Sequence, residues 1–376
     1  MHVALNLVFL VPGETGGMEV MARELVARLA DVGGLRLTAL VSREGAQADE
    51  APWGRSLPMV TLPVNSRNRA EWVRGEQQHI PRVAKAIGAD IVHSLGSTAP
   101  LWGPYKRVTT IHDLHYKLVP EAHFGLRGLG MRVLVPLAAR RSHRILAVSH
   151  ATRRDLVEHL GTPAEKIDVV PNGVAAPGET AATPADALRA RFEVGARRVL
   201  LSVSAKRPHK NLLRLLDALA GIPAERRPLL IVPGYPTPHE DELRRRAEAL
   251  GIAGDVALPA WVSAADLEGL YGLADAFVFP SLYEGFGLPL LEAMRRGVPV
   301  ASSDRGSLPE VAGDAALLFD PEDTAAMRAA IERLLADEAE AARLRAAGFA
   351  RVQAFSWEKS AELTAAAYRR VLADGR

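Results

Sequence analysis

Short apolar runs alternate with amphipathic stretches along the whole chain, and this alternation restricts the possible folds more than any other feature. The first run, VALNLVFLV (3–11), is followed by residues 17–30, where apolar side chains recur at helical spacing. Strands that alternate with helices form parallel sheets with helices on both faces. We therefore predict an α/β fold with two doubly wound, Rossmann-like domains that face a central cleft.

The length of 376 residues predicts two domains, because single cores rarely grow beyond about 250–300 residues. The boundary is expected in Ala175–Ala190, a weakly apolar segment rich in Ala, Pro and Thr. The domains would be 1–177 and 178–356, and a helical tail at about 357–376 would pack back on the first. Further strands are expected at 37–41, 89–94, 107–112, 144–149, 166–171, 197–203, 228–233, 255–259, 276–280 and 298–303, and helices at 211–220, 240–250, 264–273, 288–296 and 324–336.

The composition excludes several classes of function. The 46 basic and 44 acidic residues nearly balance, which does not suggest a nucleic-acid partner, and the lack of cysteine excludes disulfides and thiolate chemistry. No run reaches the roughly 18 apolar residues of a membrane span. The absence of cysteine fits a reducing cytosol, so a cytoplasmic protein is expected. The segment 124–144 mixes apolar residues with arginines. It could touch the inner membrane face peripherally, or be an ordinary helix with a basic outer face.

Residues 279–294 form the most informative stretch, because a glycine-rich loop there follows a strand and leads into a helix. Gly285 and Gly287 allow a ligand to approach the backbone, and the helix N-terminus near Leu288 favours a phosphate. The carboxylates of Glu284 and Glu292 can accept hydrogen bonds from hydroxyls, one from a sugar and one from a ribose. A surface loop with a helix-capping Glu is the alternative interpretation.

A basic turn follows the predicted strand at 197–203 and contains Lys206, Arg207 and Lys210. Cations at the carboxyl end of a strand suit a nucleotide diphosphate. Solvated charges on a turn would explain the same pattern, so the residues alone leave both interpretations open.

Two further strand ends in the first half carry candidate residues. Gly16 and Gly17 connect the first strand to the first helix and can bring N–H groups to a phosphate or an acceptor. This loop lacks the G-x-G-x-x-G pattern of dinucleotide sites. His112 ends another strand, and Asp113 is expected to orient its ring by a hydrogen bond.

Ser149 and Asn172 also follow strands and are secondary candidates, because turn chemistry explains both. Glu310 is interpreted as a helix-start residue, with a place in the nucleotide wall as the alternative. There is no Asp-x-Asp, and the histidines lack the spacing of zinc ligands. We therefore expect neither a metal nor another cofactor.

The stretch EGFGLPLLEAMRRGVPV (284–300) resembles the signature of the retaining glycosyltransferases of family 4, which have the GT-B fold. GGMEVMARELVARL, IHDLH, ILAVSHATRRDL, VVPNGV, SVSAKRPHKNLLRLLDAL and GSLPEVAGDAALLFDP resemble other blocks of that family in the expected order. The resemblance implies that Glu292 binds the ribose and that donor sugar and diphosphate contact a loop formed by Glu284, Gly285, Phe286, Gly287 and Leu288.

By the same resemblance, Lys210 and a basic neighbour, Arg207 or Lys206, neutralise the departing diphosphate. His112 contacts the donor sugar, and the Gly16–Gly17 loop contacts the diphosphate and the acceptor. The implied reaction moves a hexose from a nucleoside-diphosphate sugar, of UDP-glucose or GDP-mannose type, to a sugar, glycan or lipid-linked acceptor. It would retain the anomeric configuration by front-face substitution and need no metal.

Three other functions remain open. Another GT-B enzyme, such as a sugar-nucleotide epimerase or a phosphorylase, would use the same site without transfer to a separate acceptor. A catalytically silent module would bind the sugar nucleotide only. A two-domain dehydrogenase is disfavoured by the missing dinucleotide pattern.

Overall fold

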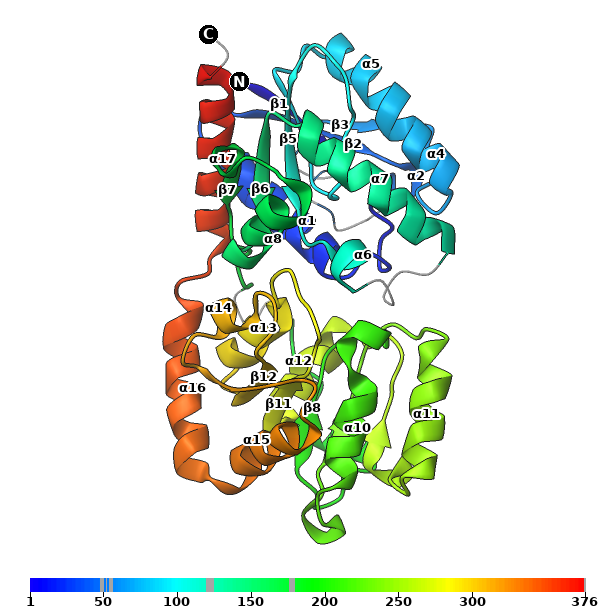
Figure 1. The fold of residues 1–376 in the computed structure, drawn as a ribbon, viewed down its shortest axis with the longest axis vertical. Helices are drawn as coiled ribbons and strands as arrows, with labels where there is room; N and C mark the ends of the chain where they lie inside the picture. Colours follow the sequence, from blue (N-terminus) through cyan, green and yellow to red (C-terminus); the bar gives the residue numbers. More distant parts are fainter. Residues whose placement is uncertain (48–50, 52, 54–56, 120–124, 176–179, 375–376) are drawn as a thin grey trace. The chain divides into compact units, whose positions relative to one another are not determined.

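The computed structural model describes residues 1–47, 51, 53, 57–119, 125–175 and 180–374, and it divides into two compact units. One unit consists of Met1–Lys117, Phe124–Gly173 and Phe355–Arg376, and the other of Val174–Ala354 with Leu118–His123. Each unit is built around its own parallel sheet with helices packed on it (Figure 1). The predicted α/β class is therefore confirmed.

The sheet of the first unit has seven strands in the order β3-β2-β1-β4-β5-β6-β7. The strands are β1 His2–Asn6, β2 Arg36–Val41, β3 Met59–Thr61, β4 Ile91–Ser94, β5 Lys106–Ile111, β6 Arg144–Ala147 and β7 Ile167–Val169. The α-helices of this part are α1 Gly17–Ala30, α2 Arg43–Ala46, α4 Arg69–Arg74, α5 Ile80–Ala86, α6 His115–Leu118, α7 Gly125–Arg141, α8 His150–Leu160 and α17 Trp357–Ala373.

The sheet of the second unit has six strands in the order β10-β9-β8-β11-β12-β13. The strands are β8 Val199–Leu201, β9 Leu229–Ile231, β10 Val256–Ala257, β11 Ala276–Phe279, β12 Val300–Ser303 and β13 Ala316–Phe319. The α-helices are α9 Ala185–Arg191, α10 Leu212–Ala220, α11 His239–Ala249, α12 Ala264–Leu273, α13 Leu288–Arg295, α14 Leu308–Ala312, α15 Thr324–Ala336 and α16 Glu338–Val352.

Strand β1 is shorter than the apolar run 3–11 that predicted it. After Asn6 the chain turns, because the Asn6 side-chain oxygen accepts a hydrogen bond from the Val8 N–H at 3.2 Å. Leu7, Val8 and Leu10 nevertheless stay buried. The apolar run 3–11 therefore predicts burial correctly, but only its first half belongs to strand β1.

The chain passes from the first unit to the second after Gly173, next to the segment 175–190 where the boundary is expected, and part of that segment is helical. Helix α9 begins at Ala185, and Leu188 on it is fully buried. Gly269 on α12 allows this packing, since a Cβ there would lie 2.6 Å from the Leu188 side chain. The weakly apolar composition of this segment therefore did not predict that Leu188 is buried.

Helix α7 contains Pro136 and spans most of the segment considered for membrane contact. Among its described side chains, Val135 and Ala138 are buried, while Arg132 and Val133 are exposed. Phe124 lies outside the described residues. No helix in the described part of the chain combines the length and the apolar character that crossing a bilayer requires.

Helix α17 packs against α1 in the first unit (Figure 1). A buried histidine ties α17 to the sheet. His93 on β4 hydrogen-bonds the Tyr368 hydroxyl of α17 through Nδ1 at 2.6 Å and the Thr110 hydroxyl through Nε2 at 2.8 Å. Burial lowers the pKa of His93 to about 3.

This histidine makes stability depend on pH. The unfolded chain takes up a proton on His93 near pH 6.5, while the folded chain does so only near pH 3, so its contribution is lost as the pH falls below 6.5. We expect His93→Gln to be less stable than the parent protein at pH 7.5. The stability gap should narrow by up to about 1.4 kcal/mol per pH unit between pH 6.5 and 4.5. Urea denaturation at several pH values measures the gap, and a constant gap would contradict this account.

Candidate functional site

The strongest candidate site lies in the second unit, where β8 and β11 are neighbours in the sheet although the chain runs through β9 and β10 between them. Connections leave such a point in opposite directions, and ligands of doubly wound sheets bind beside it, at the carboxyl ends of the strands. The segments that follow β8, β11 and β12 carry Lys210, Glu284 and Ser307 respectively.

Lys210 and Glu284 form a close ion pair at this point. The Lys210 Nζ donates to Glu284 Oε1 at 2.5 Å, and the same ammonium lies 5.2 Å from the centre of the Phe279 ring. Glu284 is buried, and Lys210 is half-buried. A lysine ammonium has three donors, so this pairing leaves donors for a further anionic ligand.

Backbone contacts between the two segments hold the pair in place. The Leu282 N–H donates to His209 O at 2.9 Å, which joins the loop after β11 to the turn before Lys210. Asn211 has a left-handed backbone (φ 59°). Its side-chain amide donates to Pro280 O at 3.1 Å and to Pro321 O at 2.7 Å. Neither Lys210 nor Glu284 therefore depends on a mobile loop for its position.

The loop 284–287 is fixed from its other side by the segment after β12. The Ser307 hydroxyl lies 3.0 Å from Glu284 O and 2.8 Å from Phe286 O. Gly306 has φ +60°, and a Cβ there would lie 2.7 Å from Glu284 O. Gly287, with φ 104°, caps the N-terminus of α13. The glycine-rich loop thus leads into a helix N-terminus at Leu288, as the sequence predicted.

Glu292 lies on α13 and is half-buried. It accepts a hydrogen bond from the Tyr271 hydroxyl at 2.9 Å, and burial raises the pKa of its carboxyl. The nearby Arg296 is engaged by Glu268 in an ion pair and also lies over the Tyr271 ring. The carboxyl is therefore held by a phenol, an arrangement that the spacing of Glu284 and Glu292 did not reveal.

The structure separates the two basic residues that the sequence left as alternatives. Lys206 is fully buried, and its Nζ donates to Gly234 O at 2.7 Å and to Pro259 O. Burial lowers the pKa of Lys206 to about 8. Lys206 thus ties together the loops that follow β8, β9 and β10. Arg207 is half-buried, and within the described residues its guanidinium makes no hydrogen bond or ion pair.

In the first unit, Gly16 caps α1 with φ 64°, and Gly17 is the first residue of that helix. The preceding loop is closed by Glu19, whose carboxylate accepts the Gly13 N–H at 2.8 Å and pairs with Arg23 at 2.8 Å. A Cβ on Gly16 would meet no atom within 4 Å. The loop therefore has open space beside Gly16.

His112 follows β5, at the carboxyl edge of the first sheet, and is buried. Its Nε2 lies 2.7 Å from Leu95 O, and its pKa is lowered by burial. The expected hydrogen bond from Asp113 to this ring is wrong, because the Asp113 carboxylate pairs with His115 Nδ1 at 2.8 Å. Burial disfavours the charged carboxylate, but His115 outweighs it and lowers the pKa of Asp113.

The secondary candidates have local structural roles. Ser149 caps α8 and accepts the Thr152 N–H at 2.9 Å. Asn172 is buried beside Gly173, where a Cβ would lie 2.3 Å from the Trp357 backbone nitrogen. Glu310 lies in the first turn of α14, as expected of a helix-start residue.

One exposed aromatic residue was missed at the carboxyl edge of the second sheet. Trp261 follows β10, is 63% exposed and meets Tyr235 edge-on, with ring centres 5.6 Å apart. An exposed indole at a ligand-binding edge can stack on a flat ring. The sequence could have predicted this position, because Trp261 comes shortly after the apolar run at 255–259.

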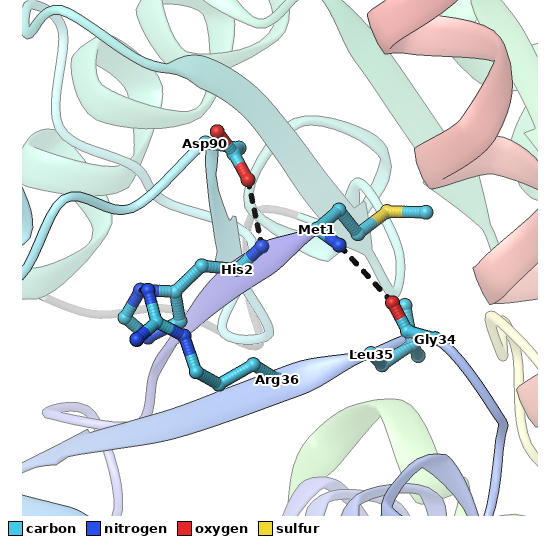
Figure 2. Close-up of a pocket in the computed structure, with 6 residues that line it drawn as sticks. All are labelled: Met1, His2, Gly34, Leu35, Arg36 and Asp90. Carbon is cyan, nitrogen blue, oxygen red and sulfur yellow. Dashed lines mark hydrogen bonds between the residues drawn. The ribbon is translucent and has the colours of Figure 1, made fainter.

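A depression in the first unit lies away from the carboxyl ends of the strands. Figure 2 shows a depression at the amino ends of β1 and β2, lined by Met1, His2, Gly34, Leu35, Arg36 and Asp90. Two of its donors are already bonded: the N–H of His2 donates to Asp90 at 2.7 Å, and the Met1 ammonium donates to Gly34 O at 3.1 Å. Within the described ranges, no cluster of three or more histidine or acidic residues could hold a metal.

Comparison with known proteins identifies the family. Residues 15–176 match the model "Glycosyltransferase Family 4", and residues 186–351 match "Glycosyl transferases group 1". The O-antigen chain mannosyltransferase B of Escherichia coli is 35% identical over 268 residues, which is 70% of each chain. The chain belongs to the group 1 glycosyltransferases. The predicted enzyme class is thereby confirmed.

Other relatives and solved structures agree with this family. The glycosyltransferase is 34% identical to the MMP alpha-(1->4)-mannosyltransferase of Mycolicibacterium hassiacum over 62% of this chain and 56% of that one. It covers about a third of the E. coli serotype-specific mannosyltransferase WbdA. The sucrose-phosphate synthase of Thermosynechococcus elongatus has the same fold over all of both chains, with a TM-score of 0.77 at 22% identity. The GT-B architecture is therefore established.

The contrast between Lys206 and Arg207 predicts different effects on stability. Lys206→Met removes a fully buried donor that bonds two partly buried carbonyl groups, and should cost about 3 kcal/mol. Arg207→Met, the matched substitution at a residue without partners in the described structure, should change stability by less than about 0.5 kcal/mol. Chemical denaturation measures both. Equal losses, or a larger loss at Arg207, would show that the assignment of the buried cation is wrong.

Proposed function

We propose that this glycosyltransferase moves a hexose from a nucleoside-diphosphate sugar to an acceptor hydroxyl, with retention of configuration and without a metal ion. The Lys210–Glu284 pair at the β8–β11 switch point carries the proposal. It combines a cation for a diphosphate with a carboxylate for sugar hydroxyls, which are the two chemistries that such a donor requires.

The diphosphate is assigned to Lys210, Arg207 and the N-terminus of α13. Lys210 has donors beyond the one that Glu284 accepts. The guanidinium of Arg207 has no partner in the described structure and can bind phosphate oxygens in bidentate fashion. The free N–H groups and dipole of the α13 N-terminus add positive potential. These groups supply electrostatic stabilisation of the kind that a divalent cation gives in other transferases.

The sugar and ribose are assigned to the two glutamates. Glu284 accepts hydroxyls of the transferred sugar, and Glu292 accepts those of the ribose. The Tyr271 hydroxyl fixes the orientation of the Glu292 carboxyl, which leaves its second oxygen for the ribose. Trp261 is assigned to stack on the nucleobase. His112 of the first unit, with Gly16 and Gly17, is assigned to the donor sugar, diphosphate and acceptor by family resemblance.

In the proposed reaction, the bond from the anomeric carbon to the diphosphate oxygen breaks as the acceptor oxygen bonds to the same face of that carbon. The acceptor proton passes to the departing phosphate oxygen. Lys210 and Arg207 stabilise the negative charge that develops on the leaving group. No second carboxylate is needed as a nucleophile, in contrast to retaining hydrolases.

The relatives favour mannose as the transferred sugar and a glycan as its acceptor. The proteins matched over most of this chain include the O-antigen chain mannosyltransferase B of E. coli. UDP-glucose is bound in a similar structure, Alr3699/HepE of Anabaena, with a TM-score of 0.76 at 21% identity. GDP-mannose is therefore the first donor to test and UDP-glucose the second. Peripheral contact with an anionic membrane remains part of the proposal for a lipid-linked acceptor.

Product analysis with a labelled sugar nucleotide separates transfer from the alternatives. Transfer places the label on a separate acceptor and releases the nucleoside diphosphate. An epimerase would return an altered sugar nucleotide, a phosphorylase would form a sugar phosphate, and a silent module would leave the donor intact.

Lys210→Ala should lower kcat by roughly 100-fold, because the leaving diphosphate loses one preorganised cation worth about 3 kcal/mol in the transition state. Arg226→Ala is the control, since Arg226 is an exposed cation of the same unit; it should keep full activity. Steady-state kinetics with the preferred donor and circular dichroism check activity and fold. Near-normal turnover in a folded Lys210→Ala protein would refute the assignment.

A further inference from the structure

The helical segment that begins at Arg69 contains an irregular turn with a buried acid. Between α4 and α5, residues Gly75–His79 form a π-helical turn, and such turns often occur at functional sites. The turn contains Glu76, which is 2% exposed. Burying a carboxyl group costs free energy unless neighbouring groups form hydrogen bonds with it. None of the functions assigned above involves Glu76.

Glu76 reaches the switch point of the first sheet. Its Oε1 accepts hydrogen bonds from the amide of Asn6 at 3.0 Å and from the Thr98 hydroxyl at 2.9 Å. Asn6 is the last residue of β1, and Thr98 lies just beyond β4, the strand beside it. Glu76 thus connects the ends of β1 and β4. Both strands end at the carboxyl edge of the sheet, where ligands of doubly wound sheets bind.

The turn that Thr98 closes, Leu95–Thr98, is the segment that holds His112. Leu95 O lies 2.7 Å from His112 Nε2, and the Ser97 hydroxyl accepts the His112 N–H at 3.2 Å. A carbonyl only accepts hydrogen bonds, so Nε2 carries the proton and Nδ1 is left as the acceptor. The turn therefore determines which ring nitrogen of His112 is available.

This turn is strained and needs external support. Ser97 has φ +66°, a left-handed conformation that is unfavourable for a residue with a side chain. It is held by the bond from its N–H to Thr110 O at 3.1 Å on one side. On the other side, the bond from Thr98 to Glu76 anchors the next residue.

We propose that Glu76 is a positioning residue for His112 and acts through Thr98 and the turn Leu95–Thr98. The inference rests on the proposed role of His112 in sugar transfer. Loss of the Thr98–Glu76 contact lets the turn relax, so that Leu95 O no longer holds the imidazole N–H. The imidazole of His112 then loses its fixed orientation toward the donor sugar, although no residue in contact with the ring has been substituted.

The test is the exchange protection of the His112 Nε2 proton, measured by NMR on the full chain with ¹⁵N-labelled histidine and no substrate. His112→Asn identifies the resonance. In Thr98→Val and in Glu76→Ala, protection should fall about tenfold or more, the effect of losing one hydrogen bond. The buried ring of His93, bonded to Tyr368 and Thr110, is the internal control and should stay protected.

Thr109→Val is the matched variant, because the Thr109 hydroxyl is equally buried but bonds Ser142 instead of Glu76. It should leave the His112 proton protected. In kinetics, Thr98→Val should lower kcat by roughly tenfold with the donor KM unchanged. The double variant of Thr98 and Glu76 should lose no more than the worse single variant, since both residues act through one contact.

Unchanged protection of His112 in Thr98→Val would overturn the proposal, even if activity fell. Thr98→Val keeps the test decisive where Glu76→Ala does not fold. Failure of the proposed function is a separate outcome: a parent protein without transferase activity would refute sugar transfer, while the protection of His112 would still report on the positioning contact.

Discussion

The ion pair between Lys210 and Glu284 joins residues that are 74 positions apart in the sequence, and the topology of the second sheet makes it possible. Since β8 and β11 are adjacent and parallel, the segments that follow them must emerge at the same edge. The contacts of Asn211, Leu282 and Ser307 then fix both segments. The proposed diphosphate site depends on that adjacency, because Lys210 and the α13 N-terminus follow different strands.

The sequence predicted the second unit well, because its strands are short, apolar and separated by amphipathic helices. The helices 264–273 and 324–336 have the predicted bounds. Strand β3 was missed because Met59–Thr61 is an edge strand with exposed or half-buried side chains, so it has no continuous apolar run. Strand β13 was missed as well, and two of its four side chains are at least partly exposed.

Side-chain partners were harder to predict than strands. Three basic residues occur within five positions of one turn, and only the fold shows that Lys206 turns inward while Lys210 meets Glu284. Asp113 lies next to His112 in the sequence, yet its carboxylate reaches His115 two residues further on. Glu76 gave no signal, because the π-helical turn that directs it inward breaks the regular helical spacing on which sequence analysis relies.

The first unit repeats the same principle with different chemistry. Its switch point lies between β1 and β4, and the polar groups there, Asn6, Glu76 and Thr98, bond one another and support the turn beside His112. In the second unit the switch point carries a charged pair with spare donors. One sheet edge thus carries a charged pair, which we propose binds an anion, and the other carries a hydrogen-bonded cluster, which we propose positions a single imidazole.

A crystal structure of the full chain with a bound nucleoside-diphosphate sugar tests the central claim most directly. The account predicts the diphosphate within hydrogen-bond distance of Lys210 Nζ and Arg207, with the ribose hydroxyls at Glu292. A sugar nucleotide bound elsewhere, with Lys210 still occupied by Glu284 alone, would contradict it.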